Sequence, residues 1–171
     1  MELHRRTAEL RRVDLRAGAA LGSSDAYALA HFAHVALTQD WHVPGHLSFA
    51  SSHAGPFETI TLPYGPQILW PDHCVQGSLD AEFSPALSIP RAELIVRKGY
   101  RRGIDSYSAF CEADGMTLTG LAGYLHERGF DRVFLAGLAT DFCVAYSAVD
   151  ARKAGFDVVV IEDACRAIDT E

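Results

Sequence analysis

The sequence predicts an α/β protein with a doubly wound, mostly parallel sheet and helices on both faces. Strand-like and helix-like segments alternate along the second half of the chain, which is the pattern of βαβ units. The strand-like segments are continuous apolar runs, as expected for parallel strands that are covered on both faces. The length of 171 residues fits a single domain over residues 1–171.

Each element has its own signal in the sequence. Leucines at helical spacing between residues 117 and 129 indicate a helix, and Gly129 is a stop signal. Residues 40–92 are rich in Gly, Pro, Ser and His and show little periodicity, so we expect a long functional loop region there. Four strands are expected, at residues 34–39, 93–98, 131–137 and 156–161. Three helices are expected, at residues 23–32, 117–129 and 141–154.

Composition and charge exclude several classes of protein. The chain has 49% hydrophobic and 22% charged residues, as globular proteins do, and it lacks the run of about 18 apolar residues that spans a membrane. The net charge of −7 argues against nucleic acid as a partner. Residues 1–22 are atypical, because they are rich in arginine and have no apolar core of a secretory signal. The four cysteines form no CxxC pair, which is typical of reduced thiols in a cytoplasmic protein.

The segment QDWHVPGH brings together residue types that bind metals. Asp40 and His42 are two positions apart, so their side chains point the same way in an extended segment. A carboxylate and an imidazole together suit zinc or iron(II). His46 follows in the same segment, and His73 or His53 would supply a further ligand from the loop region. The alternative is that these histidines are ordinary surface residues of a loop.

Cys143 lies where an apolar strand passes into a predicted helix. The N-terminus of a helix lowers the pKa of a thiol, and its N–H groups can hold an oxyanion. Lys98, at the end of another predicted strand, would stabilise the thiolate further. The alternatives are a small buried thiol for Cys143 and a solvated strand end for Lys98. Because ligands bind at the carboxyl ends of parallel strands, we expect Asp40, His42, Lys98 and Cys143 to meet there.

Four segments of the chain resemble one known family. LTQDWHVPGHLSFASSH, LWPDHCVQGS, VRKGYRRGIDSYSAF and GLATDFCV are similar to segments of the bacterial nicotinamidases, within the isochorismatase-like cysteine hydrolases. The resemblance runs from about Phe32 to the end of the chain and keeps the order of the segments. It implies about six mostly parallel strands and the hydrolysis of nicotinamide to nicotinate and ammonia in NAD salvage. It also implies that the analogue pyrazinamide is accepted.

The resemblance implies a ligand set for one divalent metal ion. Asp40 and His42 match the family's Asp-x-His pair, and His73 matches its WPxH histidine. Some members also use the histidine that matches His46. Zinc is the metal expected first, with iron and manganese as alternatives.

The resemblance also implies roles around the reacting carbon. Cys143 matches the nucleophile that forms a thioester, and Lys98 matches the catalytic lysine. A cis peptide bond is expected before Ala139, whose N–H group would face the oxyanion beside that of Cys143. Trp70 and Tyr107 match residues that line the pocket for the nicotinamide ring.

The N-terminal part of the chain departs from the family. Family members begin with a central buried strand whose aspartate is the general base, and the first strand of this chain is therefore expected to be missing or altered. Asp14 is the nearest candidate for this base, but a central strand would also bury Arg11 and Arg12, and burying their charges would cost much free energy. Residues 5–16 would fill the position in a strained way, or a second copy in a homo-oligomer would cover the exposed strands. The alternative function is a relative that binds metal or ligand but lacks the base.

Overall fold

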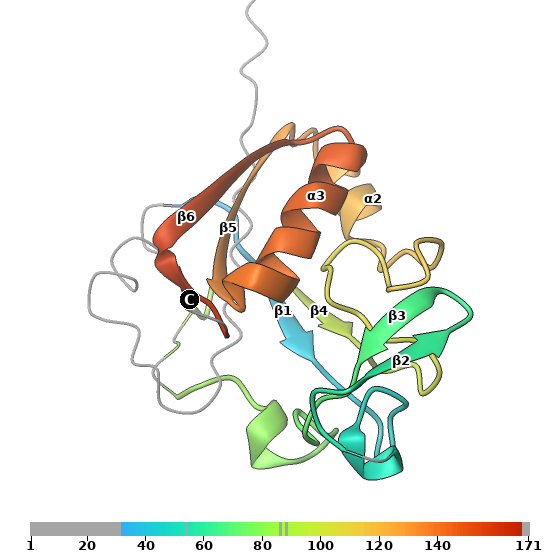
Figure 1. Ribbon diagram of the computed structural model, residues 1–171. Coiled ribbons are helices and arrows are strands. Elements are labelled where there is room, and N and C mark those ends of the chain that lie inside the picture. The colour runs from blue at the N-terminus through green and yellow to red at the C-terminus, as the bar shows by residue number, and fades with distance from the viewer. Residues whose placement is uncertain (1–31, 54, 86, 88, 169–171) are drawn as a thin grey trace, which may run out of the picture.

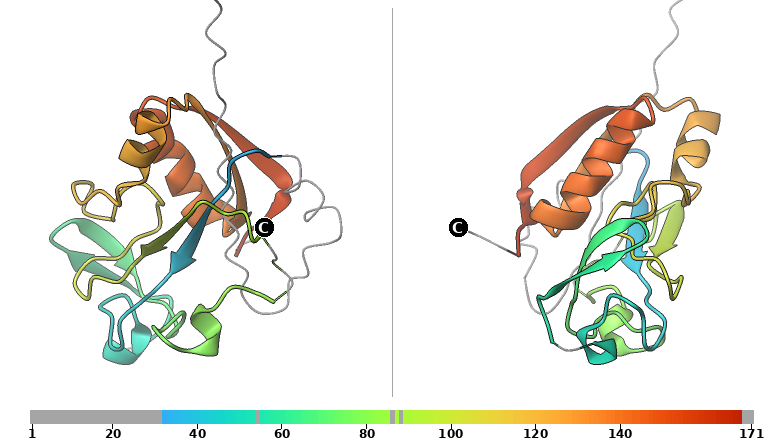
Figure 2. Two further views of the ribbon diagram at one scale, coloured as in Figure 1. Left: turned by 180° about the vertical axis from the view of Figure 1, so that it is seen from behind. Right: turned by 45° about the vertical axis from the view of Figure 1, so that its right-hand side comes forward.

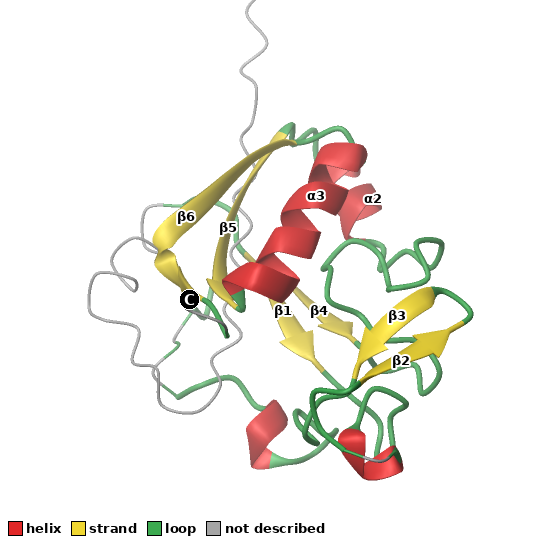
Figure 3. Cartoon of the chain, in the orientation of Figure 1, coloured by secondary structure: helices red, strands yellow, loops and turns green. Residues whose placement is uncertain are grey.

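The computed structural model describes residues 32–53, 55–85, 87 and 89–168, and it has the expected α/β architecture (Figures 1 and 3). The predictions made for Asp14, for residues 1–22 and for most of the helix at 23–32 fall outside these residues. Within the described part of the chain, no helix is long and apolar enough to cross a membrane.

Four parallel strands form two pairs. β1 (Ala36–Asp40) runs beside β4 (Leu94–Lys98), and the register sets Asp40 opposite Lys98 at the last residue of each strand. β5 (Arg132–Leu138) runs beside β6 (Asp157–Arg166). Among the described residues, no strand pairing joins β1 or β4 to β5 or β6, so the two pairs are separate in the hydrogen-bonding pattern.

Two helices complete the described framework. α2 (Leu121–Glu127) is shorter than the expected helix at 117–129, and Gly129 follows it with a positive φ of 71°, as expected for the stop signal. α3 (Ala145–Lys153) follows a single π-helical turn over Thr140–Val144. The turn and α3 together take the place of the regular helix expected at 141–154. Figures 1 and 2 show α3 lying against β5 and β6, with which it makes contact.

The loop region contains more regular structure than the sequence indicates. β2 (Thr59–Leu62) and β3 (Gly65–Ile68) form an antiparallel hairpin, and short 3₁₀ turns lie at Ala50–Ser52 and Leu79–Ala81. The expectation of a region without such elements is therefore wrong. The hairpin strands are short and mostly half-buried, and they lack the continuous apolar signal of the parallel strands.

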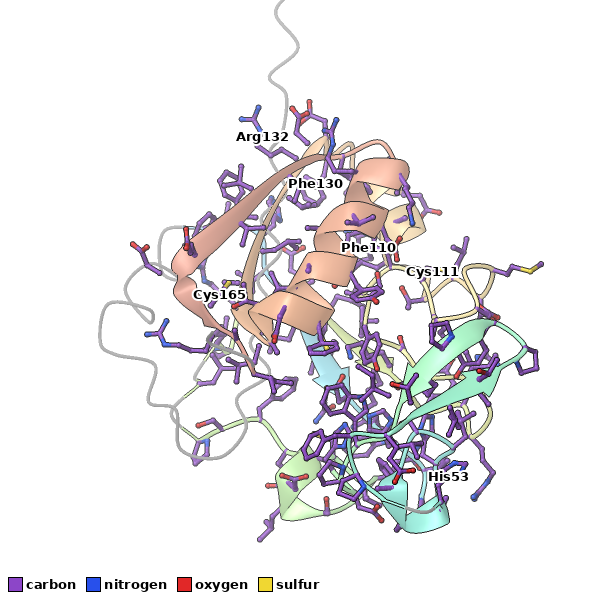
Figure 4. The ribbon with its side chains drawn as sticks, viewed as in Figure 1. His53, Phe110, Cys111, Phe130, Arg132 and Cys165 are labelled. Carbon is purple, nitrogen blue, oxygen red and sulfur yellow. The ribbon has the colours of Figure 1, made fainter. Side chains whose placement is uncertain are left out.

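The hydrophobic core joins both strand pairs to the helices. Leu121 and Leu125 of α2 are buried, as are Val133 and Leu135 of β5. Phe110 and Phe130 belong to the same core (Figure 4), and so do the following residues of other elements: Ala36, Val96, Val144, Ala151, Phe156 and Cys165. Truncating a buried leucine of this kind costs roughly 2–5 kcal/mol, so this core holds the strand ends in place for the site described next.

Candidate active site

A cavity of about 170 Å³ opens at the carboxyl ends of the parallel strands. Each of the four strands contributes its last residue to the lining: Asp40, Lys98, Leu138 and Arg166. The convergence expected from the sequence is therefore present in the structure, at the position where α/β sheets bind ligands.

Cys143 faces this cavity from the π-helical turn that follows β5. The Nζ atom of Lys98 donates to its Sγ atom across 3.7 Å and to the carbonyl oxygen of Ser106 across 2.7 Å. The side chain of Lys98 is only 1% exposed, so the alternative of a solvated strand end is wrong. An ammonium group beside a half-buried thiol favours the thiolate, which is the nucleophilic form.

Asp40 forms an ion pair with Lys98 through its Oδ1 atom, and both side chains are buried. A buried ammonium group needs such a partner, because an isolated charge in this environment would be strongly penalised. The result is a row of contacting groups from carboxylate through ammonium to thiol.

The backbone around the thiol has the form that the resemblance implies. The peptide bond between Leu138 and Ala139 is cis. The carbonyl oxygen of Ala139 accepts hydrogen bonds from the N–H groups of Phe142 and Val144, and Ser147 Oγ donates to the carbonyl of Cys143 across 2.6 Å. These bonds fix the turn that carries Cys143.

His42 presents one ring nitrogen to the cavity in a defined tautomer. Its Nδ1–H group donates to the carbonyl oxygen of Gly99 across 2.9 Å, so Nε2 carries the lone pair. Burial lowers the pKa of His42 to about 4, which keeps the ring neutral and able to bind a metal at neutral pH. Gly99 has a φ of +67°, and a Cβ atom there would come within 2.5 Å of the His42 ring. Glycine is thus needed where the backbone meets the ring.

His73 is oriented in the same way. Its Nδ1–H group donates to the carbonyl oxygen of Pro71 across 2.6 Å, and its ring centroid lies 4.7 Å from that of His42. Histidines that bind metals usually donate their other N–H group to a carbonyl or a carboxylate. His73 thus shares this hydrogen-bonding pattern with His42, whereas the group close enough to hold a metal ion among the described residues joins His42 with His46 and Asp105 and leaves out the expected Asp40 and His73.

His46 is also buried, but protein groups engage both of its ring nitrogens. Nε2–H donates to the carbonyl oxygens of Arg101 at 2.9 Å and Ile104 at 3.2 Å. Nδ1 accepts a hydrogen bond from the Ser48 hydroxyl at 2.8 Å. Although His46 lies close enough to His42 for a shared metal, binding one would break some of these bonds. The local chemistry favours a structural role for His46.

Asp105 is a buried carboxylate of the site that the sequence reasoning missed. It lines the cavity, and its oxygens lie within 4.8 Å of potential ligand atoms of His42 and His46. Gln67 Nε2 donates to Oδ2, and the Ser106 N–H group donates to Oδ1, each across 2.8 Å. Its place in the segment RKGYRRGIDSYS, soon after Lys98, was the signal that could have indicated it.

Three aromatic rings form the apolar side of the cavity. Trp70 and Tyr107, both expected there, are joined by a hydrogen bond of 2.9 Å from Trp70 Nε1 to the Tyr107 hydroxyl. Phe142, which was not expected, has its ring centroid 4.9 Å from that of Trp70 and 5.4 Å from that of Tyr107. Burial raises the pKa of Tyr107, so its hydroxyl stays neutral. The walls suit a flat aromatic ring.

His53 does not take part in the site. It is exposed, its Nε2 atom donates to the carbonyl oxygen of Leu47 across 2.8 Å, and it is not among the residues that line the cavity. Figure 4 shows it on the outer side of the loop region. The suggestion of His53 as a ligand is not supported.

The fold and the site are those of an α/β protein that carries a cysteine at a strand-to-helix turn. Comparison with known proteins identifies the family to which such a protein belongs. The isochorismatase domain family matches residues 31–171, and the chain belongs to that family.

Three known proteins show what the chain is similar to. It is 65% identical to the nicotinamidase of Acinetobacter baylyi over 137 residues, and this match covers 79% of this chain and 64% of that protein. The chain thus spans less than two thirds of the length of this curated relative. The structure of an Acinetobacter baumanii nicotinamidase and pyrazinamidase matches with a TM-score of 0.88 and 52% identity, over 96% of this chain and 86% of that one. The Pyrococcus horikoshii pyrazinamidase in complex with zinc matches with a TM-score of 0.71 and 30% identity, over 94% and 87% of the two chains.

Proposed function

We propose that this protein hydrolyses nicotinamide to nicotinate and ammonia through a thioester on Cys143. The observation that carries the proposal is the ammonium group of Lys98, 3.7 Å from Cys143 Sγ, in a cavity with aromatic walls. The similarity to proteins named nicotinamidase supports the choice of substrate. Pyrazinamide, which has a similar ring and amide, is a second substrate. The reaction would serve NAD salvage in the cytoplasm.

The proposed reaction has two steps. Cys143 Sγ attacks the amide carbon, the C–N bond breaks, and ammonia leaves with the proton that the thiol gave up. Water then attacks the thioester carbon, the C–S bond breaks, and nicotinate and the thiol are formed. The N–H groups of Ala139 and Cys143 would hold the oxyanion in both steps. In the first step the carboxylate of Asp40, in contact with the Lys98 ammonium group, would take up the thiol proton and return it to the leaving amine; in the second it would take a proton from the attacking water and return it to the thiolate.

The residues of the cavity fit a divalent metal ion, with zinc expected before iron or manganese. His42 and His73 would bind it through Nε2, because the Nδ1–H group of each donates to a backbone carbonyl. The carboxylate of Asp40, which pairs with Lys98 through Oδ1, would be the third ligand. When bound, the metal would orient the pyridine nitrogen and lower the pKa of a bound water. His46 would support this site without binding the metal, and Trp70 and Tyr107 would hold the ring.

The decisive experiment measures both products. The purified chain is loaded with zinc and given nicotinamide, and ammonia and nicotinate are quantified. We expect the two in equal amounts, with none from Cys143→Ala. A folded, zinc-loaded protein that releases neither product would contradict the proposal. It would favour the alternative, a relative that binds metal and ligand without catalysis.

A further inference from the structure

One short loop sets the orientation of the buried histidines. The loop at residues 99–105 supplies the carbonyl of Gly99 to His42 and those of Arg101 and Ile104 to His46. It ends at Asp105, whose carboxylate faces the same histidines. The position of this loop therefore decides where the ring nitrogens point.

The loop is anchored to a neighbouring segment at two points. Arg101 Nε donates to Glu112 Oε1 across 3.1 Å, and the N–H group of Ala113 donates to the carbonyl oxygen of Asp105 across 2.8 Å. The anchoring segment is itself fixed, because the Glu112 N–H group donates to the carbonyl oxygen of Thr117 across 2.8 Å. Residues 112 and 113 thus hold both ends of the stretch from Arg101 to Asp105.

Burying the carboxylate of Glu112 in this position costs free energy. It is 4% exposed, and within the described part of the chain its Oε2 atom has no hydrogen-bond partner. Its ion-pair partner Arg101 has a side chain that is 47% exposed. A buried carboxylate with one unsatisfied oxygen adds little to stability, since desolvation offsets the attraction to the arginine. A role in placing the loop explains its presence better than a role in stability.

We propose that Glu112 is a positioning residue for the metal site, which sets metal affinity by holding the loop at residues 99–105 through Arg101. The inference rests on the proposed function only in so far as His42 binds a metal. Glu112 touches neither substrate nor metal. Its effect passes through Arg101 and the backbone carbonyls that fix the histidine rings.

The test titrates metal-free protein with zinc in competition with a chelator, and with cobalt(II), whose visible absorption reports the ligand geometry. We expect Glu112→Ala and Arg101→Ala each to weaken zinc binding by about tenfold or more and to change the cobalt spectrum. The double variant should be no weaker than either single variant, because both break one contact. Glu112→Gln, whose amide oxygen can still accept from Arg101 Nε, should restore most of the affinity.

The matched control is Asp157→Asn, which breaks the exposed ion pair with Arg132 at 3.2 Å and should leave zinc affinity unchanged. Wild-type zinc affinity and cobalt spectrum in both Glu112→Ala and Arg101→Ala, with only a lower melting temperature, would overturn the proposal. If Glu112→Ala does not fold, Arg101→Ala at the exposed end of the pair decides the matter alone. No step uses nicotinamide, so a failure here is distinct from a failure of the amidase proposal.

Discussion

The two halves of the cavity are built in different ways. The nucleophile half, consisting of Lys98, Ala139 and Cys143, comes from two strand ends and the turn that follows one of them. The histidine half, consisting of His42 and His73 with the supporting His46, comes from the loop region, and backbone carbonyls fix its rings. Sites on regular elements are held more rigidly than sites on loops.

This difference determines how far from the site a substitution can act. In the nucleophile half, side chains contact one another directly, so a change there should act on the chemistry itself. In the histidine half, the rings depend on the backbone at residues 99–105, so residues that touch no ligand should alter metal binding. The following predictions test this distinction.

The largest effect is expected in the nucleophile half. Cys143→Ala should lower the rate of ammonia release by at least about 10³-fold, because the covalent step has no substitute nucleophile. Zinc affinity should stay at the wild-type value, because Cys143 belongs to the other half. A variant that retains activity would show that another group attacks the amide, and one that loses zinc would show that the halves are not separate.

The histidine half should make the stability of the metal-free protein depend on pH. The pKa of His42 is about 4 in the folded state and 6.5 in the unfolded state, so the unfolded chain binds more protons between these values. Stability is therefore full above pH 6.5 and falls as the pH is lowered toward 4, by on the order of 3 kcal/mol from this group. Urea unfolding at pH 4.5 and 7 measures the fall. In His42→Asn the fall should be clearly smaller; an equal fall would assign it to other groups.

Asp40 is the residue that joins the two halves, and its comparison with Asp105 sharpens the distinction. Asp40→Asn should weaken zinc binding by about tenfold and also slow ammonia release at saturating zinc, because its carboxylate contacts Lys98. Asp105→Asn should weaken zinc binding similarly, because the carboxylate of Asp105 lies within 4.8 Å of a potential ligand atom of His42. At saturating zinc, however, this variant should release ammonia at a rate within about threefold of wild type. Equal turnover defects in the two saturated variants would argue against the assignment.

The sequence predicted the nucleophile half better than the histidine half, for a physical reason. The strands that end at Lys98 and Leu138 are apolar runs, so their ends, and the side chains placed there, could be located within a residue or two. The family resemblance then added roles for Ala139, Trp70 and Tyr107, which line the same cavity as these strand ends.

The rest of the site depends on contacts between distant segments. Asp105 is recognisable only when the loop brings it to His42, and Glu112 only when Arg101 meets it across the turn. Whether His46 binds a metal depends on which carbonyls reach its Nε2 atom, and no local pattern encodes that. The hairpin of β2 and β3 was missed because its short, half-buried strands carry a weak apolar signal.

The smallest effect is expected at the aromatic wall that both halves share. Trp70→Phe keeps a ring against Phe142 but removes the N–H group that donates to the Tyr107 hydroxyl across 2.9 Å. A hydrogen bond of this kind contributes about 1 kcal/mol, so KM for nicotinamide should rise about fivefold while kcat changes little. Initial rates over a range of nicotinamide concentrations separate the two constants. In the proposed reaction Trp70 holds the substrate ring and takes no part in the attack by Cys143. A decrease confined to kcat would therefore mean that this wall orients the amide in the transition state instead of binding the substrate.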